Sequence, residues 1–481
     1  MYVRIQNNVQ IVAAILAVPI LALLLWNLFD LRGMMFISAV PIAVIGILIG
    51  SQKWKLSVYV FMVWLIVEGA IRKWFLPEYS SYIFLFKYLI LLCPVFHFIT
   101  YGVSIKKRDY PFYPFIIIYL LWGIFEVINP LVTNDVRVKL LGLMVHFAFI
   151  PLLYFVPLIL DDTDKILRLF KAAIIISIPI FILGIYQYYS PIDSPVNKYI
   201  GEDNIIAQAA GKVRVTSVFS YISTYATYLT VITLIIFITI VIGRMKKITM
   251  IITYIAAFLA IVNAFMTGSR GVVYLILLAV VFLLVLMLFL GLIKKKKNIL
   301  TISALALISI CTIFYTDYGQ ESVRTFTERA EKSGNVKDRV LSSVYPSNFI
   351  SQAGLVGLGI GKAYQGSTSF IGDNAGILLY SEAENEKLVL EMGILGYLIF
   401  ILLKFSIFIF SINTFRKARD RADKIILLSL IVYQIPVIIG MQGIIYNTLS
   451  GAIYWFCIGL IVSINRSVQK FNAKGFSYAP V

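Results

Sequence analysis

The sequence predicts an all-α, polytopic membrane protein with about fourteen spanning helices. Of its 481 residues, 60% are hydrophobic and only 14% are charged. A soluble protein of this length has too few polar residues to cover that much apolar surface, whereas lipid tails solvate it. Apolar runs long enough to cross a bilayer recur along the chain, and Lys and Arg gather in alternate connections between them.

The expected spans follow from these runs, two of which, 56–70 and 425–439, are short and are expected to tilt little or to re-enter. The chain divides into residues 1–315 with spans 1–11, a large loop at 316–391, and residues 392–481 with spans 12–14 and a tail. The spans are 11–28, 34–50, 56–70, 82–100, 112–129, 139–160, 167–188, 222–242, 248–265, 271–293, 298–315, 393–412, 425–439 and 448–464.

Orientation follows from the basic residues. Lys53 and Lys55, Lys165 and Arg168, and the run Lys294–Lys297 all fall in alternate connections. The positive-inside rule makes that side cytoplasmic and places both termini there. This bias also accounts for the net charge of +18, so no nucleic-acid partner is inferred. The expected location is a bacterial cytoplasmic membrane.

The three cysteines lie inside apolar runs, as do His97 and His146. This placement argues against a disulfide framework, and the spacing suggests no metal site. We expect no metal and no cofactor.

Two long connections, 190–221 and 316–391, fall on the opposite, outer side. Long loops of ordinary composition are usually functional. The outer side also holds basic residues that the positive-inside rule disfavours there. Ion pairs with Glu68, Glu126 or Asp135 account for single cases, but for the whole set an anionic ligand such as a lipid phosphate is the better explanation. The candidate phosphate-binding residues are Arg72, Lys73, Arg214, Arg270 and Arg339.

No nucleotide is present outside the membrane to drive synthesis, so an outer-face reaction on a lipid phosphate needs a donor that is already activated. A sugar on a polyprenyl pyrophosphate meets this need. The reaction requires cations for the leaving pyrophosphate and a base for the acceptor hydroxyl. Glu382 and Glu384 are the candidate bases, although acidic residues also suit the first turn of a helix. Tyr364, Tyr380 and Asn385 are candidate sugar contacts, with an interfacial belt as the alternative for the aromatic residues.

Several motifs occur in an order that resembles the bacterial O-antigen polymerases and O-antigen ligases. Residues 214–219 resemble the Arg-containing segment before a span in that superfamily, and 267–271 resemble its Ser-Arg-Gly motif. Residues 354–361 resemble its Gly-rich turn, and Glu391–Gly393 resembles the Glu-x-Gly start of the following helix. The resemblance covers roughly residues 210–410.

This resemblance implies a GT-C-type glycosyltransferase with its large extracytoplasmic loop between spans 11 and 12. It further implies that Arg214 and Arg270 hold or activate an undecaprenyl pyrophosphate, that Arg339 supports them, and that Arg270 takes part in catalysis. Flippase and chain-length regulator proteins would be its partners. Family ligases carry His nine residues before the Glu of Glu-x-Gly, and here that position is Glu382. The resemblance therefore favours a polymerase of lipid-linked repeat units, with a ligase or a lipid-linked oligosaccharide flippase as alternatives.

Overall fold

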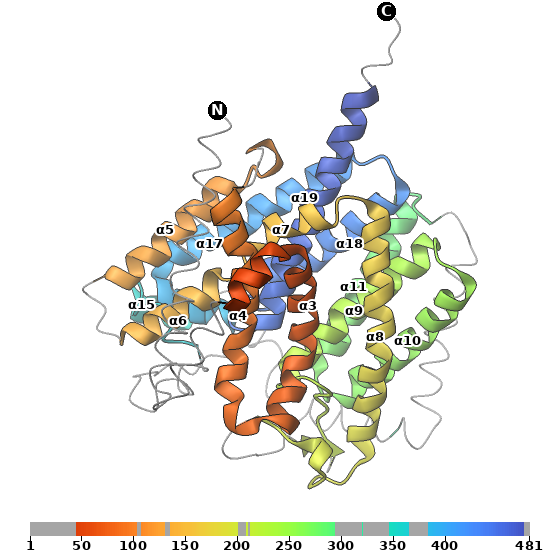
Figure 1. The fold of residues 1–481 in the computed structure, drawn as a ribbon, viewed down its shortest axis with the longest axis horizontal. Helices are drawn as coiled ribbons and strands as arrows, with labels where there is room; N and C mark the ends of the chain where they lie inside the picture. The colour runs from red at the N-terminus through yellow and green to blue at the C-terminus, as the bar shows by residue number, and fades with distance from the viewer. Residues whose placement is uncertain are drawn as a thin grey trace, which may run out of the picture.

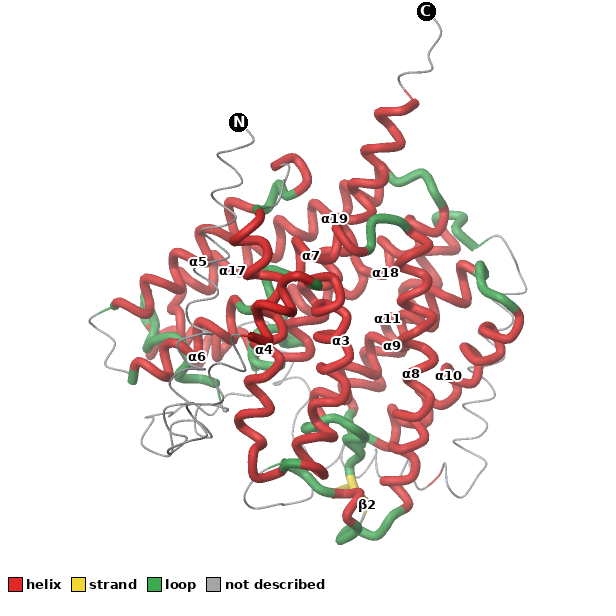
Figure 2. Tube along the Cα trace, in the orientation of Figure 1, coloured by secondary structure: helices red, strands yellow, loops and turns green. Residues whose placement is uncertain are grey.

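The structure, a computed structural model, is mostly helical and has almost no strand (Figures 1 and 2). It describes residues 45–102, 107–129, 135–200, 208–209, 212–293, 320, 346–364 and 383–475. Residues 208–213 contribute one two-stranded antiparallel sheet, β1 (Gln208–Ala209) with β2 (Lys212–Val213). The α-helices are α3 (Trp54–Ala70), α4 (Ser80–Tyr101), α5 (Tyr113–Ile128), α6 (Val136–Phe147), α7 (Leu152–Ile159), α8 (Thr163–Tyr189), α9 (Ile222–Ile242), α10 (Lys247–Met266), α11 (Arg270–Phe289), α15 (Ser347–Ala353), α17 (Glu384–Lys417), α18 (Arg421–Ile438) and α19 (Thr448–Gly475).

Short helical turns complete the fold: η1 (Ile71–Phe75), which continues α3 as a π-helix, then η2 (Pro77–Tyr79), η3 (Lys107–Asp109) and η4 (Pro195–Asn197). Among the described residues, nine helical segments are long and apolar enough to cross a membrane. The predicted all-α, multi-span class is thus confirmed at this level. The predicted spans 11–28 and 298–315, and most of 34–50, lie outside the described residues.

The predicted span 139–160 matches the described segment Val136–Ile159, in which a turn at 148–151 separates α6 from α7. The predicted span 393–412 lies within α17, which begins nine residues earlier, at Glu384, and contains a non-helical residue, Gly393, with φ of 66°. The first turns of α17 therefore belong to the segment 316–391 that was expected as a large, partly helical loop. Residues 148–151 and Gly393 are buried.

The central helices are those that the protein itself surrounds. In the α6–α7 segment Val136–Ile159 and in the Thr448–Phe471 part of α19, 94% of the apolar window is buried, against 17% in α11. Figure 1 shows α5 beside α17 on one flank and α8 beside α10 on the other, and both pairs are in contact. The outward apolar faces of peripheral helices such as α11 suit contact with lipid.

Contacts between connections separate the helix ends into two groups. Arg466 binds Asp109, Arg244 binds Asp420, and Thr163 binds Asp423, which brings the predicted cytoplasmic connections together. Trp74 binds Pro195, and Lys73 binds Thr216, which brings predicted outer connections together. The described loops therefore meet in the two groups that the predicted alternation requires.

Candidate functional site

Four buried charged side chains lie where α3 ends. Glu68 is in the last turn of α3, Arg72 and Lys73 are in η1, and Lys87 is in α4; each is at most 8% exposed. A Glu68 oxygen lies 3.3 Å from Arg72 Nη1, and both Glu68 oxygens lie 3.0 Å from Lys87 Nζ. We call these residues the cation cluster, because the cluster holds three basic groups and one carboxylate, which pairs with Arg72 and Lys87.

The segment 214–220 covers the cation cluster. Lys73 Nζ donates to Thr216 Oγ1 at 3.1 Å and to the Ser217 carbonyl, and Arg72 Nη1 donates to Ser220 Oγ at 3.4 Å. The segment 214–220 can approach α3 this closely because residue 69 is glycine: a Cβ added to Gly69 would lie 2.4 Å from the Val218 carbonyl oxygen. Predicted outer residues that are about 140 positions apart thus meet directly.

The segment 214–220 also contacts the Ser-Arg-Gly motif at residues 267–271. Arg214 Nε donates to the Thr267 carbonyl at 3.1 Å, and Val215 N lies 3.5 Å from the Met266 carbonyl oxygen. Thr267 begins the short connection to Arg270, the first residue of α11. The two motifs that the resemblance singled out are therefore neighbours in the fold.

The Gly-rich run and the Glu-x-Gly sequence also meet. The Gly-rich loop, residues 354–364, bonds to α17 on both sides of Gly393: Leu358 N donates to the Leu390 carbonyl at 2.7 Å, and Ile394 N donates to the Gly354 carbonyl at 3.1 Å. A Cβ on Gly393 would lie 2.2 Å from the Leu355 carbonyl oxygen. The contact is backbone against backbone, which requires glycine.

A buried chain of hydrogen bonds extends from this contact into the centre of the protein. Tyr119 Oη lies 2.7 Å from His146 Nδ1, His146 Nε2 lies 2.8 Å from Glu391 Oε2, and Glu391 Oε1 accepts from Ala363 N at 2.7 Å. The His146 and Glu391 side chains are both 0% exposed. We call Tyr119, His146 and Glu391 the histidine cluster.

Glu384 lies beside the histidine cluster, inside the protein and not in an exposed loop. Its Oε2 accepts from Ile445 N at 2.7 Å, while its Oε1 is buried without a hydrogen-bond partner among the described residues. Lys404 interacts with it electrostatically. Asn385, 1% exposed, follows it in the first turn of α17. A carboxylate oxygen that is free to accept a proton is what a general base requires.

Tyr364 connects the two clusters. It directly follows Ala363, which donates to Glu391, and it lies within electrostatic range of Arg72 and Glu68. Burial raises the pKa of Tyr364 above its ordinary value, Tyr221 raises it further, and Arg72 opposes the shift. The phenol therefore stays protonated and can donate a hydrogen bond.

The predicted site residues thus divide into three groups. Arg72 and Lys73 bind the segment that begins at Arg214, and Arg214 binds Thr267, three residues before Arg270. Tyr364 interacts electrostatically with Arg72. Glu384 and Asn385 lie near the histidine cluster. Glu382, Arg339 and Tyr380 lie outside the described residues. His146 was not predicted as a site residue, although an ionisable side chain within an apolar run usually faces a polar partner.

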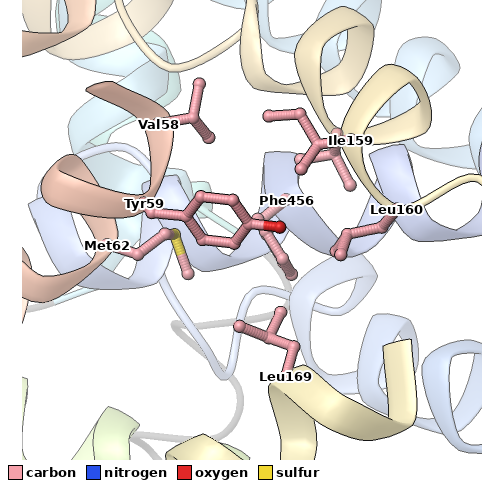
Figure 3. A pocket seen from close by; sticks show the side chains of 8 residues that line it. Val58, Tyr59, Met62, Ile159, Leu160, Leu169 and Phe456 are labelled. Carbon is pink, nitrogen blue, oxygen red and sulfur yellow. The ribbon is translucent and has the colours of Figure 1, made fainter. Parts of the chain in front are cut away.

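A separate pocket between α3, α7, α8 and α19 is apolar (Figure 3). Val58, Met62, Ile159 and Leu169 are among its lining residues, and no charged side chain lines it. Met62 is about 15 Å along the helix from Arg72, so this pocket is distinct from the cation cluster. In the part of the chain that the structure describes, no three His, Cys, Asp or Glu residues are grouped to hold a metal.

No protein-family model matches the chain, and a search of curated proteins finds no significant relative.

Proposed function

We propose that this protein is a glycosyltransferase of the outer face of the bacterial cytoplasmic membrane. Its donor is an oligosaccharide repeat unit on undecaprenyl pyrophosphate, and its product is a longer lipid-linked polysaccharide. The observation that carries the proposal is the cation cluster, in which three buried basic side chains have one carboxylate among them and two of the three bind segment 214–220.

That excess calls for an anion. Glu68 neutralises one charge among Arg72, Lys73 and Lys87, and Lys73 donates to neutral oxygens of Thr216 and Ser217. A buried cation without a counter-charge costs on the order of several kcal/mol. A pyrophosphate supplies the missing negative charge, and Arg214, adjacent to Thr267, extends the basic surface toward Arg270.

The location favours a lipid-carried anion over a soluble one. Arg72 and Lys73 end a helix that is long and apolar enough to cross a membrane, and Arg270 begins another. A pyrophosphate on a polyprenyl chain lies at this boundary, with its tail among lipids and its sugars in water. The sugar on this carrier is already activated, because pyrophosphate is a good leaving group.

In the proposed reaction, an acceptor sugar hydroxyl attacks the anomeric carbon of the donor. The new bond joins the acceptor oxygen to that carbon, and the bond to the pyrophosphate oxygen breaks with its electron pair. Arg214, Arg270 and Lys73 stabilise the charge on the departing pyrophosphate. The acceptor proton passes to a carboxylate, Glu382 or Glu384.

The test uses a strain from which this gene is deleted, complemented with the wild-type chain or with Arg214→Ala, Arg270→Ala or Arg137→Ala. Arg137 is the matched control, because it is on the same predicted side but pairs with Asp135 at 2.9 Å. We expect the two site variants to lose long polymer and to accumulate single lipid-linked units on the outer leaflet, and the control to make full polymer.

Other patterns in the deletion strain would contradict the proposal. Accumulation of long polymer on the lipid carrier would indicate a ligase. Accumulation of single units on the inner leaflet would indicate a flippase. Full-length polymer in both site variants would show that the assigned site is wrong.

A further inference from the structure

One acidic side chain, Glu391, holds the end of the Gly-rich loop in addition to the backbone hydrogen bonds between that loop and α17. Glu391 uses both carboxylate oxygens, one toward His146 Nε2 at 2.8 Å and one toward the backbone of Ala363 at 2.7 Å. When His146 Nε2 carries the imidazole hydrogen, it donates to Glu391 and Nδ1 accepts from Tyr119. The hydrogen bonds then run in one direction, from Tyr119 through His146 to Glu391.

The attachment point lies one residue from Tyr364, which interacts electrostatically with Arg72 and Glu68. Ala363 is 1% exposed and Tyr364 is 8% exposed, so the end of the loop is enclosed. On its other side the loop contacts α6, where a Cβ on Gly361 would lie 2.1 Å from the Val138 carbonyl oxygen. The position of Tyr364 therefore depends on Glu391, and the orientation of Glu391 depends on His146.

We propose that His146 is a positioning residue, which fixes Glu391 and thereby holds the Gly-rich loop and Tyr364 against the cation cluster. The proposal rests on the proposed function, because the cation cluster is taken as part of the donor site. His146 and Glu391 are fully enclosed, so they act on the reaction through the loop and not by touching substrate. His146 and Glu391 thus form a path of side-chain hydrogen bonds from α6 and α17 to that loop, beside its backbone hydrogen bonds with α17.

The experiment compares two matched pairs of variants. Gln at position 146 keeps a donor for Glu391, whereas Phe removes it. Gln at position 391 keeps an acceptor for Ala363 N, whereas Met removes it. The pairs are His146→Gln with His146→Phe, and Glu391→Gln with Glu391→Met.

Loop position is measured with a thiol probe in the full-length protein. Ala363→Cys is introduced after Cys93, Cys311 and Cys457 are replaced by Ser, and a membrane-impermeant maleimide is applied to cells. Leu355→Cys is the control, because Leu355 is 63% exposed on the same loop. Expression level and a single gel-filtration peak establish that each variant is folded.

We expect Ala363→Cys to be protected in the parent and in both Gln variants. In His146→Phe and Glu391→Met the labelling rate should rise roughly tenfold or more, because a buried donor or acceptor is left unpaired. Leu355→Cys should react equally in all backgrounds. If one Phe or Met variant fails to fold, the other gives the result.

Polymer formation in the same strains separates this proposal from the proposed function. Loss of polymer in the Phe and Met variants with retention in the Gln variants supports the positioning role. Unchanged protection of position 363 in those variants overturns it, as does an opened loop with full polymer when Arg214→Ala makes none. If Arg214→Ala also makes full polymer, the donor-site assignment fails, whatever the labelling shows.

Discussion

At the scale of single residues, Lys73 contributes most clearly to an anion site. Its side chain is 1% exposed, donates to Thr216 and Ser217, and lies 4.5 Å from the centre of the Trp74 ring. These partners hold the ammonium group in place but do not neutralise it. A bound pyrophosphate would do so at short range, where low dielectric strengthens the attraction.

The Lys73→Met variant tests this role, since Met keeps much of the apolar stem and removes the charge. We expect binding of undecaprenyl pyrophosphate to purified protein to weaken about tenfold or more. Lys53→Met is the control, because Lys53 is exposed at the other end of α3. Equal binding by both variants would exclude Lys73 from the donor site.

The two candidate bases can be tested by replacing Glu382 and Glu384 separately with Gln. For Glu384, the amide retains an acceptor for Ile445 N, so the fold should persist while proton uptake is lost. A general base contributes roughly 100- to 10,000-fold to rate. We expect the rate of polymer formation per unit of protein to fall at least about 100-fold in one of the two variants. Full activity in both would rule out these carboxylates.

At the scale of elements, glycine determines how closely the Gly-rich loop and the helices approach. Gly361 has φ of 90° and contacts α6, and Gly393 has φ of 66° and contacts the loop from within α17. The break at Gly393 leaves the Met392 carbonyl free to accept from Trp122 Nε1 at 3.0 Å. The loop therefore packs against an interruption in a helix that its own backbone helps to stabilise.

Gly361→Ala should destabilise the protein by about 1–3 kcal/mol, because the new Cβ overlaps the Val138 carbonyl and the backbone is left-handed there. Gly271→Ala is the matched control: Gly271 lies in the first turn of α11, and nothing lies within 4 Å of an added Cβ. Thermal unfolding of purified protein measures both. A Gly361→Ala variant as stable as the control would contradict the observed packing.

Sequence patterns predicted some elements well and others poorly. The span expected at 222–242 matches α9, because polar residues flank a continuous apolar run. The span expected at 393–412 begins nine residues after the start of α17, because Glu384 and Glu386 lower the hydropathy of its first turn although both are buried. Hydropathy records polarity, and it cannot distinguish a polar residue in water from one that is paired inside the protein.

At the scale of the whole molecule, long-range contacts create the candidate site. His146 and Glu391 are 245 positions apart, and no local pattern connects them. In the sequence, Arg214 and Thr267 are related only through the order of their motifs along the chain. The sequence motifs thus identify the arginines of the candidate site, but the pairing of His146 with Glu391 depends on the packing of α6 against the Gly-rich loop and α17.

The two groups of connections should lie on opposite sides of the membrane, so cysteines placed in them should react with maleimide from opposite sides. Single cysteines at Arg244 and Asp420, in one group of loops, should react with an impermeant maleimide only after the cells are permeabilised. Cysteines at Tyr221 and Leu355, in the other group, should react in intact cells. Labelling of all four from the same side would contradict the two-sided arrangement, and the reverse pattern would place the cation cluster in the cytosol.

The most direct measurement of the central claim uses purified protein in liposomes with purified undecaprenyl-pyrophosphate-linked repeat units and no nucleotide. We expect polymer in steps of one repeat, with one undecaprenyl pyrophosphate released for each new linkage, and neither product from Arg214→Ala or Arg270→Ala. Absence of both polymer and released carrier with the wild-type protein, when it is folded and donor is bound, would show that the protein is not a polymerase of these units.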